Sequence, residues 1–216
     1  MADYLTPASE LDAVNLMLSS FGGTRINSLA GELPIDAAEA QGTLNEISRD
    51  IQKRGWYWNT EYYKLSPNTD GKIALPENTL SVDAVDSNEG LRVTARSGFL
   101  YNLTPYSSGD DFTDYDPISL KLVLGLKFDD LPGAARAYVS HKAARIFVAR
   151  QEGDQIALQT AGQEENTSLA DLRREDNRAV PRSMRNSLSV RRVLARGVDY
   201  LHNDYGSRTF LRRSGG

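Results

Sequence analysis

The sequence predicts an α+β fold: a helical bundle formed by N-terminal and later helices, a central antiparallel β-module and an extended C-terminal arm. Apolar residues recur at helical spacing near both ends of the folded part, alternate with polar residues between them, and become sparse after Pro181. We therefore expect N-terminal helices in 1–55, the β-module in 56–128, long helices packing on the first ones in 129–180, and the arm in 181–216.

Capping residues mark the first two helices. Thr6 or Ser9 is placed to cap the first helix, which Gly22 and Gly23 should end. A second helix is expected from Asp36 to about Gly55. Its first half is rich in small residues, which would let another helix approach closely; these residues are Ala37, Ala38, Ala40 and Gly42.

The middle of the chain alternates apolar and polar residues between turn signals, the pattern of half-buried strands. About six strands are predicted, in residues 61–65, 72–75, 80–85, 91–95, 99–103 and 120–126. The helical pattern returns with Asp129, Asp130 and Pro132 as its start signal and runs towards Gly153. A last, mostly polar helix should follow and bury one thin face through its few apolar anchors, which are Ile156, Leu158, Leu169 and Leu172.

Charge is distributed unevenly along the chain. Residues 1–171 carry 14 Lys and Arg against 25 Asp and Glu, a net charge of −11, whereas residues 172–216 carry 11 Arg against four acidic residues, a net charge of +7. A chain polarised in this way favours contact with copies of itself or with an acidic partner, either protein or nucleic acid. A solvated arginine-rich tail is the simpler alternative.

Several classes of site are excluded by what the sequence lacks. It contains no cysteine, so disulfides, thiolate zinc sites and cysteine nucleophiles are ruled out. It has no phosphate-binding glycine loop and no Gly-x-Ser-x-Gly motif, and its two histidines, His141 and His202, cannot form a histidine metal cage. We therefore predict no catalytic, cofactor or metal site, and a packing or capping role for His141.

Two clusters leave alternatives open. The acidic loop that contains Asp110, Asp111, Asp114 and Asp116 could bind a cation or supply the carboxylates of a hydrolase, although a solvated turn is the simpler interpretation. The aromatic cluster could stack on bases or sugars, but its place at a helix-to-strand junction favours core packing. Its members are Trp56, Tyr57, Trp58, Tyr62 and Tyr63.

No stretch approaches the roughly 20 apolar residues of a membrane span, and the first residues lack the pattern of a signal peptide. We therefore expect a soluble protein that is made and folded in a cytoplasm.

Three stretches together resemble the tail tubular protein A family of short-tailed podophages. They are residues 10–22, the Ala-rich second helix, and residues 54–60 with the sequence Arg-Gly-Trp-Tyr-Trp-Asn-Thr. The resemblance implies a structural virion protein, made in the host bacterial cytoplasm, that acts as a head-to-tail adaptor. Twelve copies would form a ring below the portal, join it to the tail nozzle and offer docking surface to tail fibres, while double-stranded DNA passes through the lumen.

The family has no catalytic residues to carry over, so the expected functional residues are interface residues in the arm. Their bidentate guanidinium groups suit carboxylates on the portal or on an adjacent copy. The candidates are Arg182, Arg185, Arg191, Arg192 and Arg196. A DNA-binding accessory protein and an envelope-degrading hydrolase remain as alternative functions.

Overall fold

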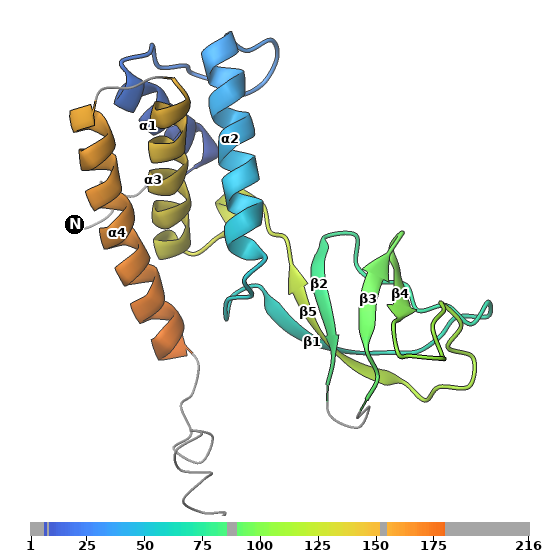
Figure 1. The fold of residues 1–216 in the computed structure, drawn as a ribbon. Coiled ribbons are helices and arrows are strands. Elements are labelled where there is room, and N and C mark those ends of the chain that lie inside the picture. Colours follow the sequence, from blue (N-terminus) through green and yellow to red (C-terminus); the bar gives the residue numbers. More distant parts are fainter. Residues whose placement is uncertain (1–6, 8, 86–89, 152–154, 180–216) are drawn as a thin grey trace, which may run out of the picture. The chain divides into compact units, whose positions relative to one another are not determined.

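The computed structural model describes residues 7, 9–85, 90–151 and 155–179, which belong to one compact unit ending at Ala179. The fold is α+β, as predicted, with four α-helices packed together and small antiparallel sheets (Figure 1). The elements in chain order are α1 (Glu10–Phe21), α2 (Ile35–Gln52), β1 (Thr60–Leu65), β2 (Thr79–Ala84), β3 (Val93–Arg96), β4 (Phe99–Asn102), β5 (Ile118–Leu124), the 3₁₀ turn η1 (Phe128–Asp130), α3 (Gly133–Arg150) and α4 (Gln155–Ala179).

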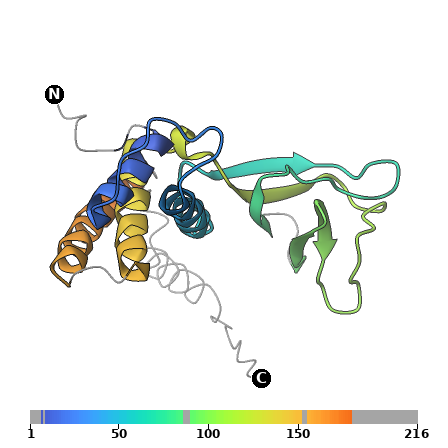
Figure 2. The same ribbon diagram turned by 90° about the horizontal axis from the view of Figure 1, so that it is seen from above.

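The four helices share one hydrophobic core. Helix α3 lies between α2 and α4 and also packs on α1 (Figure 2). The apolar stripes predicted from the sequence meet here, and each helix contributes buried side chains, among them Val14, Leu18, Leu44, Ile51, Phe147 and Leu172. Ser9 caps α1 in a reciprocal capping box with Asp12, whereas Thr6, the other candidate cap, lies outside the described residues. Among the described residues, no helix is long and apolar enough to cross a bilayer.

The strands form a three-stranded sheet in the order β1-β5-β2 and a separate β3-β4 hairpin. Central strand β5 pairs antiparallel with both neighbours, with Leu120 opposite Tyr63 on one side and Ala84 on the other. The alternating leucines of β5 face a second hydrophobic core that the hairpin helps to close. Its most buried members are Ile73, Leu100, Phe112, Ile118, Leu120 and Leu122.

The predicted strand at 72–75 was wrong, so the described residues hold five strands in place of about six. Ile73 and Leu75 are buried as expected, but Ala74 forms only an isolated bridge with Phe99. The chain turns away at once because Pro76 follows, and proline has no N–H to continue a ladder.

The start signal of α3 was also interpreted wrongly. Asp129 lies in the 3₁₀ turn and accepts a hydrogen bond from the N–H of Glu10 at 2.9 Å, so its carboxylate serves the start of α1. Leu131 is extended, with ψ of 147°, because a residue before proline disfavours helical geometry. Helix α3 therefore begins only at Gly133.

A pair of buried amides joins the helical core to the sheet core. The Gln52 amide donates to the Leu126 carbonyl at 3.0 Å and accepts from the Leu126 N–H at 2.7 Å, as a paired strand would. The Asn59 amide donates to the carbonyls of Gln52 and Leu124 and accepts from the N–H of Trp56. Gln52 is 2% exposed and Asn59 is fully buried, so every one of these groups needs its partner.

We predict that Asn59→Ala lowers the free energy of unfolding by about 3 kcal/mol, because it leaves buried carbonyls and an N–H without partners. Urea denaturation followed by circular dichroism measures the change. The matched control is Asn78→Ala, because the exposed Asn78 side chain makes a single hydrogen bond, to the Gly125 carbonyl. The control should cost less than about 1 kcal/mol; equal losses in the two variants would contradict the account.

Candidate assembly site

The five predicted interface arginines, Arg182, Arg185, Arg191, Arg192 and Arg196, all lie outside the described residues. Their role stays a prediction. The structure does describe the helix that leads to them, because α4 ends at Ala179. How firmly α4 is attached to the rest of the bundle is therefore the structural basis of the candidate site.

Helix α4 buries a thin face against α3, as the sequence predicts. Its buried positions are few, namely Ala161, Ser168 and Leu172, and the predicted anchors Leu158 and Leu169 are half-buried. Ile156 was wrongly taken as an anchor and is 71% exposed. So narrow a contact leaves most of the α4 surface open to solvent. The polar contacts between α3 and α4 therefore matter more for holding the helix.

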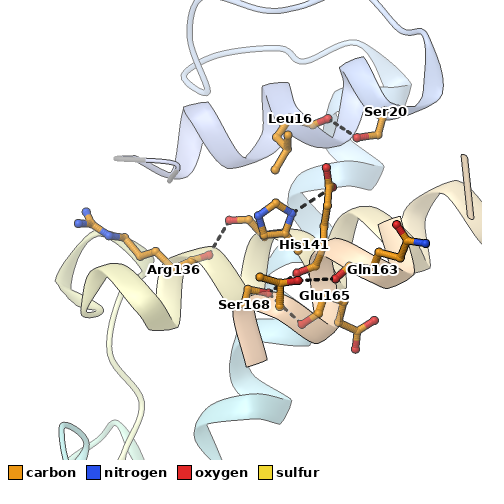
Figure 3. Close-up of polar contacts among 10 residues, drawn as sticks. Leu16, Ser20, Arg136, His141, Gln163, Glu165 and Ser168 are labelled. Atoms are coloured by element: carbon orange, nitrogen blue, oxygen red, sulfur yellow. Dashed lines mark hydrogen bonds and ion pairs between the residues drawn. The ribbon is translucent and has the colours of Figure 1, made fainter. Parts of the chain in front are cut away.

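Two polar pairs join α3 to α4, and Figure 3 shows the one made by His141. The His141 Nδ1 lies 3.3 Å from the Glu164 carboxylate, and the Arg145 guanidinium pairs with Glu165. The His141 side chain is only 17% exposed and the Glu165 side chain 16%, so both lie within the seam between the helices. His141 thus has the packing role predicted for it.

Tyr57 fixes the far end of α4. Its hydroxyl donates to the Glu175 carboxylate at 2.5 Å, and its backbone N–H donates to Asp176 at 3.1 Å. Burial raises the pKa of Tyr57 to about 12, and the hydrogen bond and nearby charge of Glu175 add to the effect. Both acceptors lie near the C-terminus of a helix, where the macrodipole disfavours negative charge. This placement is a sequence signal that could have indicated a hydrogen-bond donor from elsewhere in the chain.

The last turns of α4 also present cations to solvent. Arg173, Arg174 and Arg178 are exposed, although Arg174 pairs with Asp171 one turn earlier. The arginine-rich part of the chain therefore begins on an ordered helix that is held at Tyr57. These three arginines were missed as candidate site residues because the sequence placed them in a segment predicted to pack.

The acidic loop has a structural role for its first two carboxylates. Asp110 forms an ion pair with Lys72 at 2.8 Å, which lowers the pKa of that carboxyl. Asp111 accepts from the Thr113 hydroxyl at 2.6 Å and from the Thr113 N–H at 3.0 Å, which lowers the pKa of Asp111. In the part of the chain that the structure describes, no three His, Cys, Asp or Glu side chains are grouped to hold a metal ion.

The aromatic cluster is mostly used for packing. The Trp56 indole N–H donates to the Ile51 carbonyl at 2.9 Å, and Trp58 packs on the helical core. The Tyr63 hydroxyl donates to Glu61 at 2.6 Å, while Tyr62 points away and is 72% exposed. Stacking on bases or sugars is therefore not the use that this geometry favours.

Comparison with known proteins agrees with the resemblance noted in the sequence. A profile described as "Tail tubular protein" matches residues 11–181. The chain belongs to the tail tubular protein family. This tail tubular protein is also 32% identical over 146 residues to tail tubular protein A of Klebsiella phage KP34. The aligned region covers 67% of this chain and 75% of the relative. It is thus a structural protein of the phage virion tail, from a family that is not an enzyme family.

The profile match ends just before the predicted interface arginines. It covers the four helices except for Glu10, both sheets and the α4 end at Tyr57, and stops at residue 181. The arginines from Arg182 onward therefore lie outside the matched residues of this tail tubular protein.

We predict that Tyr57→Phe lowers the free energy of unfolding by about 1 kcal/mol and speeds amide exchange in the last turns of α4, because Glu175 loses its donor. The raised pKa means that this contribution is complete below the ordinary pKa of 10.0 and is lost as the pH rises towards 12. The stability difference between the two proteins should therefore shrink over that range.

Tyr62→Phe is the control, because the exposed Tyr62 should tolerate the change to within about 0.5 kcal/mol. Amide exchange in α4 that is the same in wild type and Tyr57→Phe would show that Tyr57 does not hold the helix.

Proposed function

We propose that this tail tubular protein is a head-to-tail adaptor subunit, one of twelve copies in a ring that joins the portal to the tail nozzle. The ring would also offer docking surface to tail fibres and surround a lumen through which double-stranded DNA passes. The observation that carries the proposal is the family match over residues 11–181, which spans the described folded body. The subunit would act without catalysis or cofactor, after synthesis in the host bacterial cytoplasm.

The acidic body suits the passage of DNA. Residues 1–171 have a net charge of −11, and a negatively charged wall repels phosphates, whereas a basic wall would release counterions and retain the duplex. The charge balance of this part therefore favours a channel that DNA slides through over one that binds it.

The arm is proposed as the clasp for neighbouring protein. The arginines from Arg182 to Arg196 would pair with carboxylates on the portal or on an adjacent copy, in bidentate contacts that lysine cannot form. The attachment of α4 at Tyr57 supports this proposal, because an arm that starts from a held point loses less entropy when it binds.

The native mass of the purified protein, alone and with its portal, tests the ring. We expect an assembly near twelve copies when the portal is present. A monomer that does not associate with the portal would reject the proposal, and clear retardation of duplex DNA at physiological salt would favour a DNA-binding accessory protein.

A matched pair of charge-removal variants tests the arm. Replacing Arg191, Arg192 and Arg196 with Gln should weaken portal or self-association at least tenfold in sedimentation, roughly the loss of one charged contact. Replacing Arg208, Arg212 and Arg213 with Gln removes the same charge from the end of the arm and should have a smaller effect. Equal losses would mean that net charge, and not the proposed segment, drives association.

A further inference from the structure

Among the described residues, strand β1 pairs only with β5 and so forms an outer edge of the three-stranded sheet. The Leu124 N–H donates to the Asn59 carbonyl at 2.8 Å, which makes Asn59 and Leu124 a hydrogen-bonded pair. Hydrogen-bonded and non-hydrogen-bonded pairs alternate along an antiparallel ladder. The backbone groups of residues 61, 63 and 65 therefore face β5, and those of Thr60, Tyr62 and Lys64 point outward.

The opposite side of the sheet confirms this alternation. The Val85 N–H donates to the Ser119 carbonyl at 2.9 Å, so the odd-numbered residues of β5 serve β2 while the even-numbered ones serve β1. The outer side of β2 lies near β3, which covers it (Figure 1). Within the described residues, nothing pairs with the outer side of β1.

This edge lacks two of the devices that usually protect an exposed strand, a proline and a bulge, although Lys64 does place a charge on it. Strand β1 has six residues, no proline and no bulge in its pairing with β5. Tyr62, at its middle, holds a large ring 72% exposed beside unpaired backbone groups. An exposed strand with these properties is a template for another extended strand.

The order of residues along β1 suits a second copy of itself. In an antiparallel pair centred on Tyr62, the two tyrosines lie opposite each other and each Lys64 lies opposite the uncharged Thr60. On the other face, Glu61 lies opposite Tyr63, whose hydroxyl already donates to a Glu61 carboxylate within one chain. Registers centred on Glu61 or Lys64 would instead set like charges opposite each other, which is destabilising.

We propose that two free copies of this protein associate through β1 in this register, which joins their three-stranded sheets into one of six strands. Such a two-fold contact is closed, so it differs from the head-to-tail contact that builds a ring. It covers the exposed edge of subunits that are not yet assembled. The inference does not depend on the adaptor function, and either can fail without the other.

The absence of cysteine allows a direct test by cross-linking of the full chain. Residues opposite each other in a hydrogen-bonded pair have Cα atoms about 5.5 Å apart, a separation that a disulfide spans. Tyr62→Cys should therefore form a covalent dimer on mild oxidation. Tyr106→Cys, at another exposed tyrosine that lies outside β1 in the loop after β4, is the control and should form no covalent dimer.

A mixed experiment tests the register. Thr60→Cys and Lys64→Cys should each cross-link poorly alone and should form a heterodimer when mixed. Equal cross-linking of Tyr62→Cys and Tyr106→Cys, or a dimer of Lys64→Cys that forms as readily as the mixture, would overturn the proposed pairing.

Amide exchange of the unmodified protein gives a second test, which needs no substitution that could itself alter the fold. The amides of Thr60, Tyr62 and Lys64 should become protected as protein concentration rises, while those of Glu61 and Tyr63 are protected throughout. Outward amides that exchange freely at every concentration would overturn the proposal. Protection that does not change with concentration would also overturn it and would show that another segment of the same chain covers the edge.

Discussion

The buried amides of Gln52 and Asn59 are the constraint on which the rest of the structure depends. The two hydrophobic cores have separate membership, and the chain crosses between them after α2 and again after β5. At this crossing Gln52 pairs with both backbone groups of Leu126, and Asn59 pairs with Gln52 and Leu124. Without water to replace them, these hydrogen bonds hold the helix end and the strand end together.

The turn that contains Trp56 and Tyr57 also contacts the end of α4, the helix that precedes the candidate interface arginines. Trp56 donates from its indole to the end of α2, and its neighbour Tyr57 donates to Glu175 near the end of α4. The helix that precedes the proposed arm is thus attached to the turn that joins the two cores. Helix α4 otherwise buries only a thin face. The hydrogen bond from the Tyr57 hydroxyl therefore matters more for holding α4 in place than one hydrogen bond would on a broadly buried helix.

Local signals in the sequence were enough to predict most elements. Ser9 and Gly22 bound α1, helical spacing identified α2 and α4, and the alternating leucines identified β5 with its buried face. The strand predicted at 72–75 failed because a local signal, the proline that follows it, was given too little weight. Ile73 and Leu75 are as apolar as a strand requires, yet Pro76 and a single bridge to Phe99 leave them outside the ladder.

The candidate site was less predictable than the fold, because its contacts join residues far apart in sequence. Nothing near Tyr57 indicates that its partner lies 118 residues away, and Asp129 looks like the cap of α3 although it binds α1. Only the acidic pair at the end of α4, which opposes the helix dipole, gave a local sign of an outside donor. The charge asymmetry predicted an interacting arm without specifying its partner.

The central claim is that a folded body holds α4 so that the arm after it can bind neighbouring protein. An electron cryomicroscopy map of the portal–tail junction tests this claim most directly. The account predicts that α4 stays attached at Tyr57 and that the arginines from Arg182 to Arg196 lie against carboxylates of the portal or an adjacent subunit. Arginines on the DNA, or an arm without any protein contact, would contradict it.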